Sequence, residues 1–255
     1  MPRLPNAAII IPAYNCADTL ERTLDSVMSS IAYAFEQGLE ASYEVAVVDD
    51  GSTDETVQIA QRMRTEHDEI KIIQQENAGP GAARNTGVRE TVGQFLFFLD
   101  SDDVFYPNHI YLCLSKLLER EDLGYVFTKL KIDMPMHPDW PPSIDESNPI
   151  NFCIRRIWHD MVEGYPVGPD FTRYRTEDTV YRLQIRDLVK HEKIEAFTCE
   201  QFVSPGNALD RQREKFSMAM PAWNRSGKDD GFVLTPAMEK EIDRRLARLK
   251  KLMGG

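Results

Sequence analysis

The sequence predicts an α/β protein with a mostly parallel central sheet flanked by helices, and two observations predict it. Over the first 130 residues, short β-branched runs alternate with longer segments of helical spacing, which is the pattern of βαβ units. The run 95–99 is apolar on both faces, as is typical of a central, fully buried strand. The expected strands are 7–11, 44–49, 70–74, 95–100 and 125–132.

Helices are expected between these strands. Leu20, Leu24, Val27 and Ile31 follow one another at intervals of four, three and four residues, which places them on one face of a helix. The segments 18–21 and 52–55 have the spacing of a capping box, so helices are predicted to begin there.

The pattern changes after residue 132. The segment 133–149 contains five prolines around Trp140, which predicts a long loop with neither a helix nor a central strand. Long loops in compact domains commonly serve as lids or binding loops. The segment 204–235 is weakly patterned, and a helix is expected from Pro236 because apolar residues recur there at helical spacing.

Composition excludes several classes of function. The chain has 30 Lys and Arg against 41 Asp and Glu, a net charge of −11, so nucleic acid is not an expected partner. No apolar stretch approaches the roughly 18 residues of a membrane span, and no targeting segment is recognised, so a cytoplasmic protein is expected. The four cysteines are too scattered for a zinc or redox pair and are interpreted as reduced packing residues.

Carboxylates and glycines follow the predicted strands at the end where open α/β sheets bind ligands. Asp100 and Asp102 lie one residue apart just after a buried strand. Paired carboxylates suit Mg²⁺ or Mn²⁺, with water and phosphate oxygens completing the coordination. The alternative is that Asp102 or Asp103 caps the helix near Pro107, and for Asp103 capping is the favoured interpretation.

Three further candidate residues also follow predicted strands. Asp50 follows the second strand, where its carboxylate is able to accept the imide N–H of a uracil or to serve only as a turn residue. A tight turn at Gly79 lets the backbone approach a ligand closely, and Arg84 supplies a forked cation. An ordinary turn with a solvated arginine is the alternative.

A second acidic pair, Glu177 and Asp178, lies about 75 residues downstream. Transfer to a sugar hydroxyl needs a base, and a neighbouring carboxylate raises the pKa of such a base. A solvated helix start capped by Thr176 is weighed equally with this interpretation.

In this order the motifs resemble glycosyltransferase family 2, the inverting nucleotide-sugar transferases with the GT-A fold. The resemblance is dense over 7–115 and thin over 150–185. It implies a GT-A domain over 1–220, with a nucleotide-binding part about 1–130 and an acceptor part about 131–220, before a C-terminal extension, 221–255, with an amphipathic helix. The stretches that carry it are 9–15, 47–52, 77–87, 99–103 and 176–178.

The resemblance also implies a site and a mechanism. The donor would be a nucleotide-sugar, with UDP expected, and the cofactor Mn²⁺ or Mg²⁺. One displacement at the anomeric carbon would invert its configuration. The residues that match the family's motifs are Pro12, Ala13 and Tyr14 at the nucleoside, Asp50 at the uracil, Gly79 and Arg84 near the nucleotide, Asp100 and Ser101 by the ribose or diphosphate, Asp102 at the metal, and Asp178 as general base.

Two departures from the family pattern concern the acceptor. One is that the segment 133–175 has no pattern that maps onto the family beyond Arg155, Arg156 and Gly164. The segment 212–216, Gln-Arg-Glu-Lys-Phe, is a distant echo of the Gln-x-x-Arg-Trp motif of processive members, and no membrane helices follow it. A non-processive enzyme with a carbohydrate or lipid-linked acceptor is therefore expected, and a homo-oligomer is left open. The basic last helix allows peripheral contact with the inner face of a membrane, but simple packing is the favoured interpretation.

Two other functions stay open. The stretch 95–104 fits the strand-then-DxDxV start of haloacid-dehalogenase-like phosphatases, with Asp100 as nucleophile, although this leaves the segment 49–52 without a role. A non-catalytic nucleotide- or glycan-binding module on the same scaffold would bind nucleotide without turnover.

Overall fold

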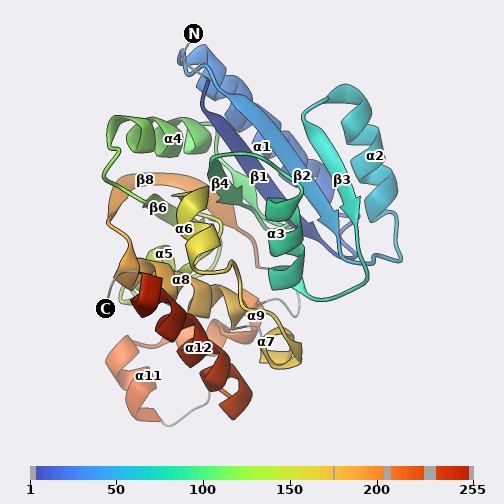
Figure 1. Cartoon of the computed structure of the whole chain (residues 1–255). Coiled ribbons are helices and arrows are strands. Elements are labelled where there is room, and N and C mark those ends of the chain that lie inside the picture. Colours follow the sequence, from blue (N-terminus) through green and yellow to red (C-terminus); the bar gives the residue numbers. More distant parts are fainter. Residues whose placement is uncertain (1–3, 175, 204–207, 227–233, 253–255) are drawn as a thin grey trace.

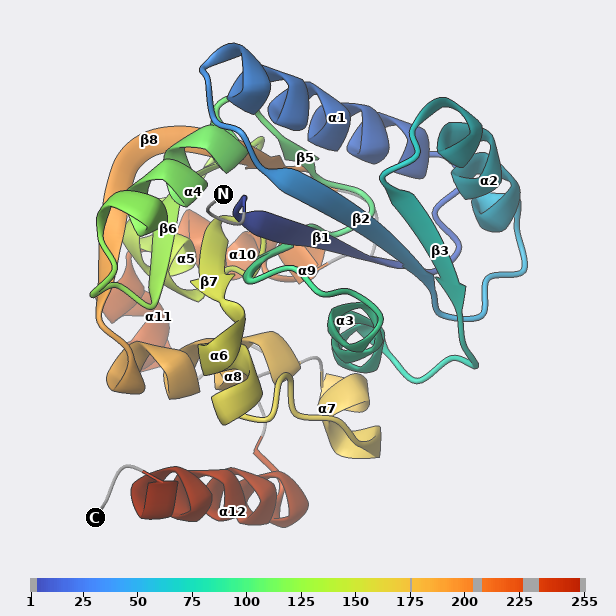
Figure 2. The same ribbon diagram turned by 45° about the horizontal axis from the view of Figure 1, so that its top comes forward.

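A computed structural model of the chain confirms the α/β class. It describes residues 4–174, 176–203, 208–226 and 234–252. Within that part of the chain, one sheet of eight strands has the order β3-β2-β1-β4-β7-β6-β8-β5, with helices on both of its faces (Figures 1 and 2).

The expected strands form close to their expected positions. β1, β2, β3 and β4 pair in parallel, and β4 ends two residues earlier than expected. Beyond β4 the sheet is mixed, because β7 is antiparallel to both of its neighbours. The strands are β1 (Asn6–Ala13), β2 (Ser42–Asp49), β3 (Ile70–Gln74), β4 (Phe95–Phe98), β5 (Val104–Phe105), β6 (Tyr125–Ile132), β7 (Phe152–Arg155) and β8 (His191–Gln201).

The helices expected after the first two strands also form. They begin at Leu20 and Thr56, two and four residues after the first residue of each predicted capping box, and the residues at the N-cap positions, Thr19 and Glu55, make no side-chain capping bond. Asp54 instead accepts a hydrogen bond from the Thr56 backbone N–H, at 3.0 Å. The helices are α1 (Leu20–Glu36), α2 (Thr56–Glu66), α3 (Pro80–Arg89), α4 (His109–Glu119), α5 (Trp140–Ser147), α6 (Arg156–Met161), α7 (Pro169–Tyr174), α8 (Glu177–Leu188), α9 (Ala208–Arg211), α10 (Arg213–Ser217), α11 (Met220–Ser226) and α12 (Pro236–Leu252).

Alternate residues of β1 divide between two hydrophobic cores. Ile9 and Ile11 point to the core that contains Leu24 of α1, whereas Ile10 points to the core that contains Tyr181 of α8. All five side chains are fully buried. A strand that is apolar on both faces belongs in the middle of such a three-layer fold. The sequence predicted this for the run 95–99, and β4 does divide in the same way, with Phe97 in the first core and Leu96 and Phe98 in the second.

The prediction of a helix-free loop over 133–149 is wrong for its central part. Residues 140–147 form α5, and Pro141 and Pro142 stand in its first turn. Proline is tolerated there because the N–H that it lacks would have no partner within the helix, and its fixed φ already suits helical backbone. The prolines therefore start a helix in this segment, and that helix forms one wall of the site described below.

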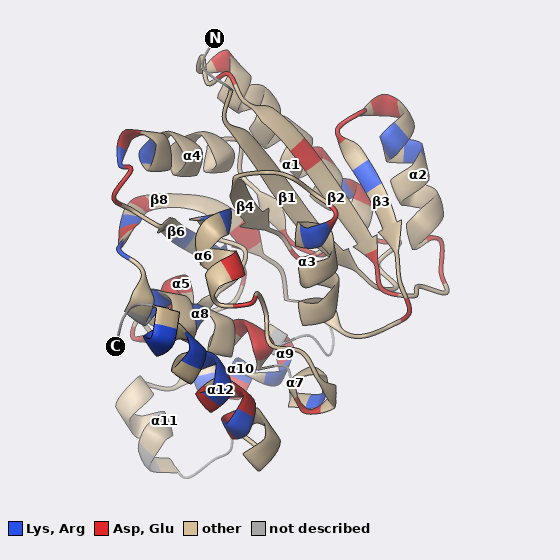
Figure 3. Ribbon diagram, in the orientation of Figure 1, with Lys and Arg blue, Asp and Glu red and all other residues tan. Residues whose placement is uncertain are grey.

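The C-terminal helix is confirmed from Pro236, and it packs against the domain. Arg245 of α12 is 5% exposed and donates hydrogen bonds to the carbonyls of Val162 (2.9 Å) and Gly164 (2.7 Å). Arg244 and Arg248 of the same helix pair with Glu163. Figure 3 shows basic residues along much of α12.

Three of the six basic residues of α12 are thus committed to the loop 161–165, which favours packing over a membrane-facing role. Contact with a membrane stays a prediction. No helix in the described ranges is long and apolar enough to cross a bilayer. Residues 227–233 and 253–255 of the expected extension lie outside the described residues.

Candidate active site

The loops that follow the parallel strands meet at one edge of the sheet. The backbone N–H of Asn15, after β1, donates to Ser52 Oγ, after β2, at 2.9 Å, and the Asn15 side chain accepts from the Thr53 N–H at 2.8 Å. The hydroxyl of Thr19, at the start of α1, donates to the carbonyl of Ser101, after β4, at 2.8 Å. Direct hydrogen bonds therefore hold together the loops that follow β1, β2 and β4.

Of the three residues expected at the nucleoside, one has an exposed side chain. Pro12 is buried, Ala13 is 1% exposed, and Tyr14 is 52% exposed at the end of β1. An exposed aromatic ring beside a polar loop suits stacking on a base. The contact of all three residues with a nucleoside stays a prediction.

Asp50 holds the neighbouring loop in place. Its carboxylate accepts hydrogen bonds from Gln75 Nε2 (2.7 Å) and from the backbone N–H groups of Ala78 and Gly79 (2.9 Å each). The residue is only 3% exposed. In this arrangement Asp50 fixes residues 75–79, and a contact with a uracil stays a prediction.

Gly79 is a position that requires glycine. Its φ is +90°, in the left-handed region, and a Cβ there would lie 2.7 Å from the hydroxyl oxygen of Thr172 in α7. The loop after β3 therefore passes directly under α7. This close approach joins the loop after β3 to a segment more than 90 residues further along the chain.

Arg84 is an internal cation, not the solvated arginine of the alternative interpretation. It is 3% exposed, and its Nη2 donates to Asp100 Oδ1 at 2.5 Å. Its Nη1 lies 3.6 Å from Glu177 Oε1, and the guanidinium is 5.1 Å from the centre of the Tyr165 ring. Burial lowers the pKa of Arg84, but Asp100, Tyr165 and Glu177 outweigh burial, so the pKa rises and the charge is kept.

The acidic pair at the start of α8 is divided between two environments. Glu177 is 5% exposed and faces Arg84, whereas Asp178 is only half-buried and lines a cavity. Burial, and then the charge of Asp178, raises the pKa of Glu177 to about 7. Burial also raises the pKa of Asp178 although Arg84 opposes it. The alternative of a solvated helix start is wrong, because Thr176 is 2% exposed and makes no capping bond.

The interpretation of Asp103 as a helix cap is also wrong. α4 begins at His109 with Asn108 before it, and Asp103 is 1% exposed and accepts a hydrogen bond from the Phe202 N–H at 3.0 Å. Burial, and then the charges of Asp102 and Asp100, raises the pKa of Asp103 well above its usual range. The turn after β4 thus concentrates three carboxyl groups, and a bound cation would relieve their repulsion.

The structure does not by itself define a metal centre. Across the described ranges, no group of three or more His, Cys, Asp or Glu side chains is arranged to hold an ion. Asp100 and Asp102 fit a metal that takes only one or two protein ligands and fills its other positions with diphosphate oxygens and water. Metal binding at Asp102 stays a prediction.

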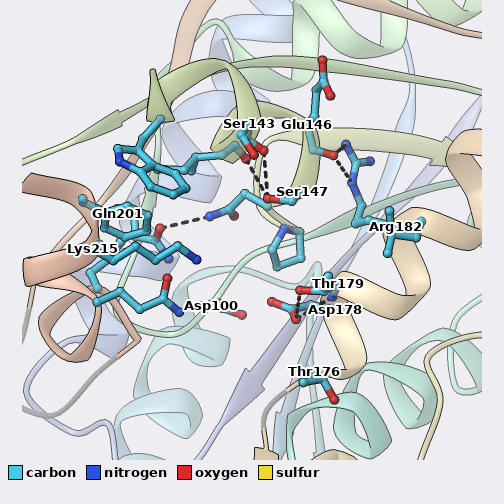
Figure 4. Close-up of a pocket in the computed structure, with 18 of the residues that line it drawn as sticks. Asp100, Ser143, Glu146, Ser147, Thr176, Asp178, Thr179, Arg182, Gln201 and Lys215 are labelled. Carbon is cyan, nitrogen blue, oxygen red and sulfur yellow. Dashed lines mark hydrogen bonds between the residues drawn. The ribbon is translucent and has the colours of Figure 1, made fainter. Parts of the chain in front are cut away.

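A cavity of about 700 Å³ opens in front of Asp100 and Asp178 (Figure 4). One wall is α5 with the residues that follow it, the second is α8, and the third is formed by Gln201 and the segment 209–216. Asp178 and Thr179 point into this space from the start of α8 (Figure 4). The cavity therefore places two carboxylates that are 78 positions apart in the sequence on one binding space.

Most of the residues that line this cavity lie outside the sequence motifs. The exceptions are Asp100, Thr176 and Asp178, and the segment 212–216, which contributes Gln212, Lys215 and Phe216 at the spacing of the processive motif. The partial match of 212–216 to the processive motif was the one sequence feature that pointed to the third wall of the cavity. Trp140 also lines the cavity, although its ring is buried and its indole N–H donates to the Met218 carbonyl at 2.7 Å.

The model of a protein family described as glycosyl transferase family 2 matches residues 8–192. The chain belongs to glycosyltransferase family 2. This membership makes it a glycosyltransferase with a GT-A-like fold and confirms the resemblance seen in the motifs. It also weighs against the phosphatase alternative, whose nucleophile, Asp100, is here engaged by Arg84.

Two relatives illustrate the sequence similarity. Chondroitin synthase of Escherichia coli is 36% identical over 128 residues, which are 50% of this chain and 18% of that protein. Glycosyltransferase AglE of Haloferax volcanii is 42% identical over 100 residues, which are 39% of this chain and 31% of that protein. The matched segment thus spans less than a third of either relative, so their activities as whole proteins do not transfer to this chain.

Two solved structures share the fold over nearly the whole chain. Residues 1–349 of S. aureus TarS, in complex with UDP-GlcNAc, give a TM-score of 0.67 at 18% identity, covering 96% of this chain and 73% of that one. The mannosyltransferase PcManGT of Pyrobaculum calidifontis, in complex with GDP-Man and Mn²⁺, gives 0.64 at 19% identity, covering 97% and 70%. Identities this low establish the fold and not the substrate.

Proposed function

We propose that this glycosyltransferase moves a sugar from a nucleotide-sugar, with UDP as the nucleotide, to an acceptor hydroxyl, with inversion at the anomeric carbon. The observation that carries the proposal is that Asp100 and Asp178 line one cavity, while behind them the buried guanidinium of Arg84 pairs with Asp100 and lies 3.6 Å from Glu177. The UDP and UDP-GlcNAc complexes of TarS support a uridine nucleotide, and the GDP-Man complex of PcManGT keeps guanosine as the competing choice.

In the proposed mechanism Asp178 is the general base. The acceptor hydroxyl loses its proton to the Asp178 carboxylate as its oxygen attacks the anomeric carbon. The bond from that carbon to the diphosphate oxygen breaks on the opposite face, which inverts the configuration. Burial raises the pKa of Asp178, and a stronger base takes a hydroxyl proton more readily.

The donor would lie against the ends of β1, β2 and β4, with Tyr14 on the base and Asp100, Ser101 and Asp102 near the diphosphate. A divalent metal held by Asp102, Mn²⁺ or Mg²⁺, would supply positive charge to the departing diphosphate. Arg84 is too deeply buried to contact the donor, and we assign it to holding Asp100 in place. Gly79 keeps the loop before α3 close to this site.

The nucleotide and the metal are tested together by thermal unfolding. UDP, GDP, CDP and TDP are each added with and without Mn²⁺ to the wild type and to Asp102→Asn. A ligand at a hundred times its Kd stabilises the folded state by about 2.7 kcal/mol. That is roughly 5–11 °C in a chain of this size. A Mn²⁺-dependent shift with UDP, lost in Asp102→Asn, is expected, and no shift with any nucleotide would contradict the donor site.

The base is tested by turnover. Asp178→Asn is expected to reduce transfer by about 10²- to 10⁴-fold, the usual contribution of a general base, while the thermal shift by nucleotide is kept. Asp68→Asn, an exposed aspartate remote from the cavity, is the matched control.

NMR of the product reports the anomeric configuration, and retention would refute the single displacement. Nucleotide binding without turnover in the wild type would instead support the binding-module alternative.

A further inference from the structure

Apart from Asp100 and Asp178, the charged residues of the cavity are mainly basic. They comprise four cations and one carboxylate, although the whole chain carries a net charge of −11. These cations lie on two facing walls, α8 and the segment 209–216. They are Arg182, Arg186, Arg211 and Lys215, and the carboxylate is Glu146.

The cations on α8 follow the proposed base along one face of the helix. Asp178, Arg182 and Arg186 are spaced by four residues, so they lie one above another on the same side. At 1.5 Å per residue, Arg182 lies about 6 Å and Arg186 about 12 Å along the axis from Asp178. A sugar whose hydroxyl faces Asp178 would extend beside these two arginines.

Arg182 is a buried cation in the cavity wall. It is 3% exposed, its Nε and Nη2 donate to the Glu146 carbonyl at 3.2 and 2.9 Å, and its guanidinium lies 4.2 Å from the centre of the Phe152 ring. Within the part of the chain that the structure describes, its Nη1 has no hydrogen-bond partner. An anion in the adjoining cavity would compensate this buried charge.

We propose that the acceptor is an anionic sugar, with a carboxylate or phosphate about 6–12 Å from the hydroxyl that faces Asp178, recognised by Arg182, Arg186 and Arg211. The proposal rests on the proposed function, because it takes Asp178 as the base. The donor diphosphate is a separate anion, which that function places by Asp102, and Asp102 does not line this cavity.

The test measures binding with the donor site filled. The protein is saturated with the nucleotide and Mn²⁺ that stabilise it most, and matched probes are titrated by NMR: glucose 6-phosphate against glucose, and methyl glucuronide against methyl glucoside. At least one charged probe is expected to bind with a Kd about tenfold lower than that of its neutral counterpart, a difference in binding free energy of about 1.4 kcal/mol. The two pairs distinguish a phosphate from a carboxylate.

Substitution of the cavity arginines tests whether the preference for charged probes arises in the cavity. The double variant Arg186→Gln/Arg211→Gln is expected to lose the charge preference and to keep nucleotide binding. Arg213→Gln is the matched control, since Arg213 is exposed on the neighbouring helix and does not line the cavity. Equal binding within both pairs, or no binding of either charged probe, would overturn the proposal.

Loss of nucleotide binding in the double variant would overturn it as well, by assigning the two arginines to the donor. If no nucleotide binds the wild type, the proposed function fails by itself. The charge preference is then measured in the nucleotide-free protein, so the two failures remain distinguishable.

Discussion

Replacing Glu177 by glutamine is expected to stabilise the protein above neutral pH and to have little effect in mild acid. Burial, and then the charge of Asp178, raises the pKa of Glu177 from 4.5 to about 7 in the folded state. Its Oε2 has no hydrogen-bond partner among the described residues, and its Oε1 is 3.6 Å from Arg84, so its charge is poorly compensated. The ionised form of Glu177 therefore opposes folding.

The sign and size follow from proton linkage. Between pH 4.5 and about 7 the folded protein holds a proton on Glu177 that the unfolded chain has lost. The free energy of unfolding therefore falls as the pH rises through this window. The difference between the two pKa values corresponds to at most about 3 kcal/mol. Glutamine cannot ionise, so the variant escapes this loss.

Thermal unfolding from about pH 5 to about pH 8 checks the prediction. At the highest pH the Tm of Glu177→Gln is expected to exceed that of the wild type by up to about 6–12 °C, and the gap should close toward acid. Glu76→Gln, an exposed glutamate in the neighbouring loop, is the control and should follow the wild type. Equal Tm values at about pH 8, or a gap that persists at about pH 5, would refute the reasoning.

Three further predictions concern folding stability, measured by denaturant titration. Arg84→Met leaves two carboxylates without their buried cation and is expected to cost about 3–5 kcal/mol, more than Arg84→Lys. Gly79→Ala forces a Cβ against Thr172 at a φ of +90° and is expected to cost about 1–3 kcal/mol, partly restored by adding Thr172→Ala. Arg245→Met leaves buried carbonyls without donors and should cost about 2–4 kcal/mol. Arg244→Gln on the exposed side should cost less than about 1 kcal/mol. A loss below about 1 kcal/mol at Arg84 or Arg245 would contradict the contacts described.

The first half of the fold was predictable because local pattern and tertiary environment agree there. A strand that is apolar on both faces, such as 95–98, has no stable place except between two helical layers. The same holds for the helix that begins at Leu20, whose apolar face is continuous. Parallel strands then bring their carboxyl ends to one edge, so the motifs after β1, β2 and β4 had to meet.

The second half of the fold was less predictable, because proline was counted without regard to its position. Pro141 and Pro142 break a helix if they stand inside it and start one if they stand in its first turn, and the pattern alone did not distinguish these cases. The cavity walls come from α5, α8 and the segment 209–216, which are far apart in the sequence. Lys215 belonged to a weak motif echo, whereas Arg186 belonged to no motif.

The burial of individual charges was the part that sequence could not supply. Glu177 and Asp178 are adjacent, and successive residues of a helix point about 100° apart, so one side chain faces inward and the other faces the cavity. The inward carboxylate pairs with Arg84, which also holds Asp100 on the other side of the site. The ionisation of Glu177 therefore changes the charge next to the proposed base without contacting a substrate. Burial and the charge of a neighbouring carboxylate raise the pKa of both members of this pair: the neighbour is Asp178 for Glu177 and Asp100 for Asp178. Perturbed pKa values of this kind are concentrated at functional sites.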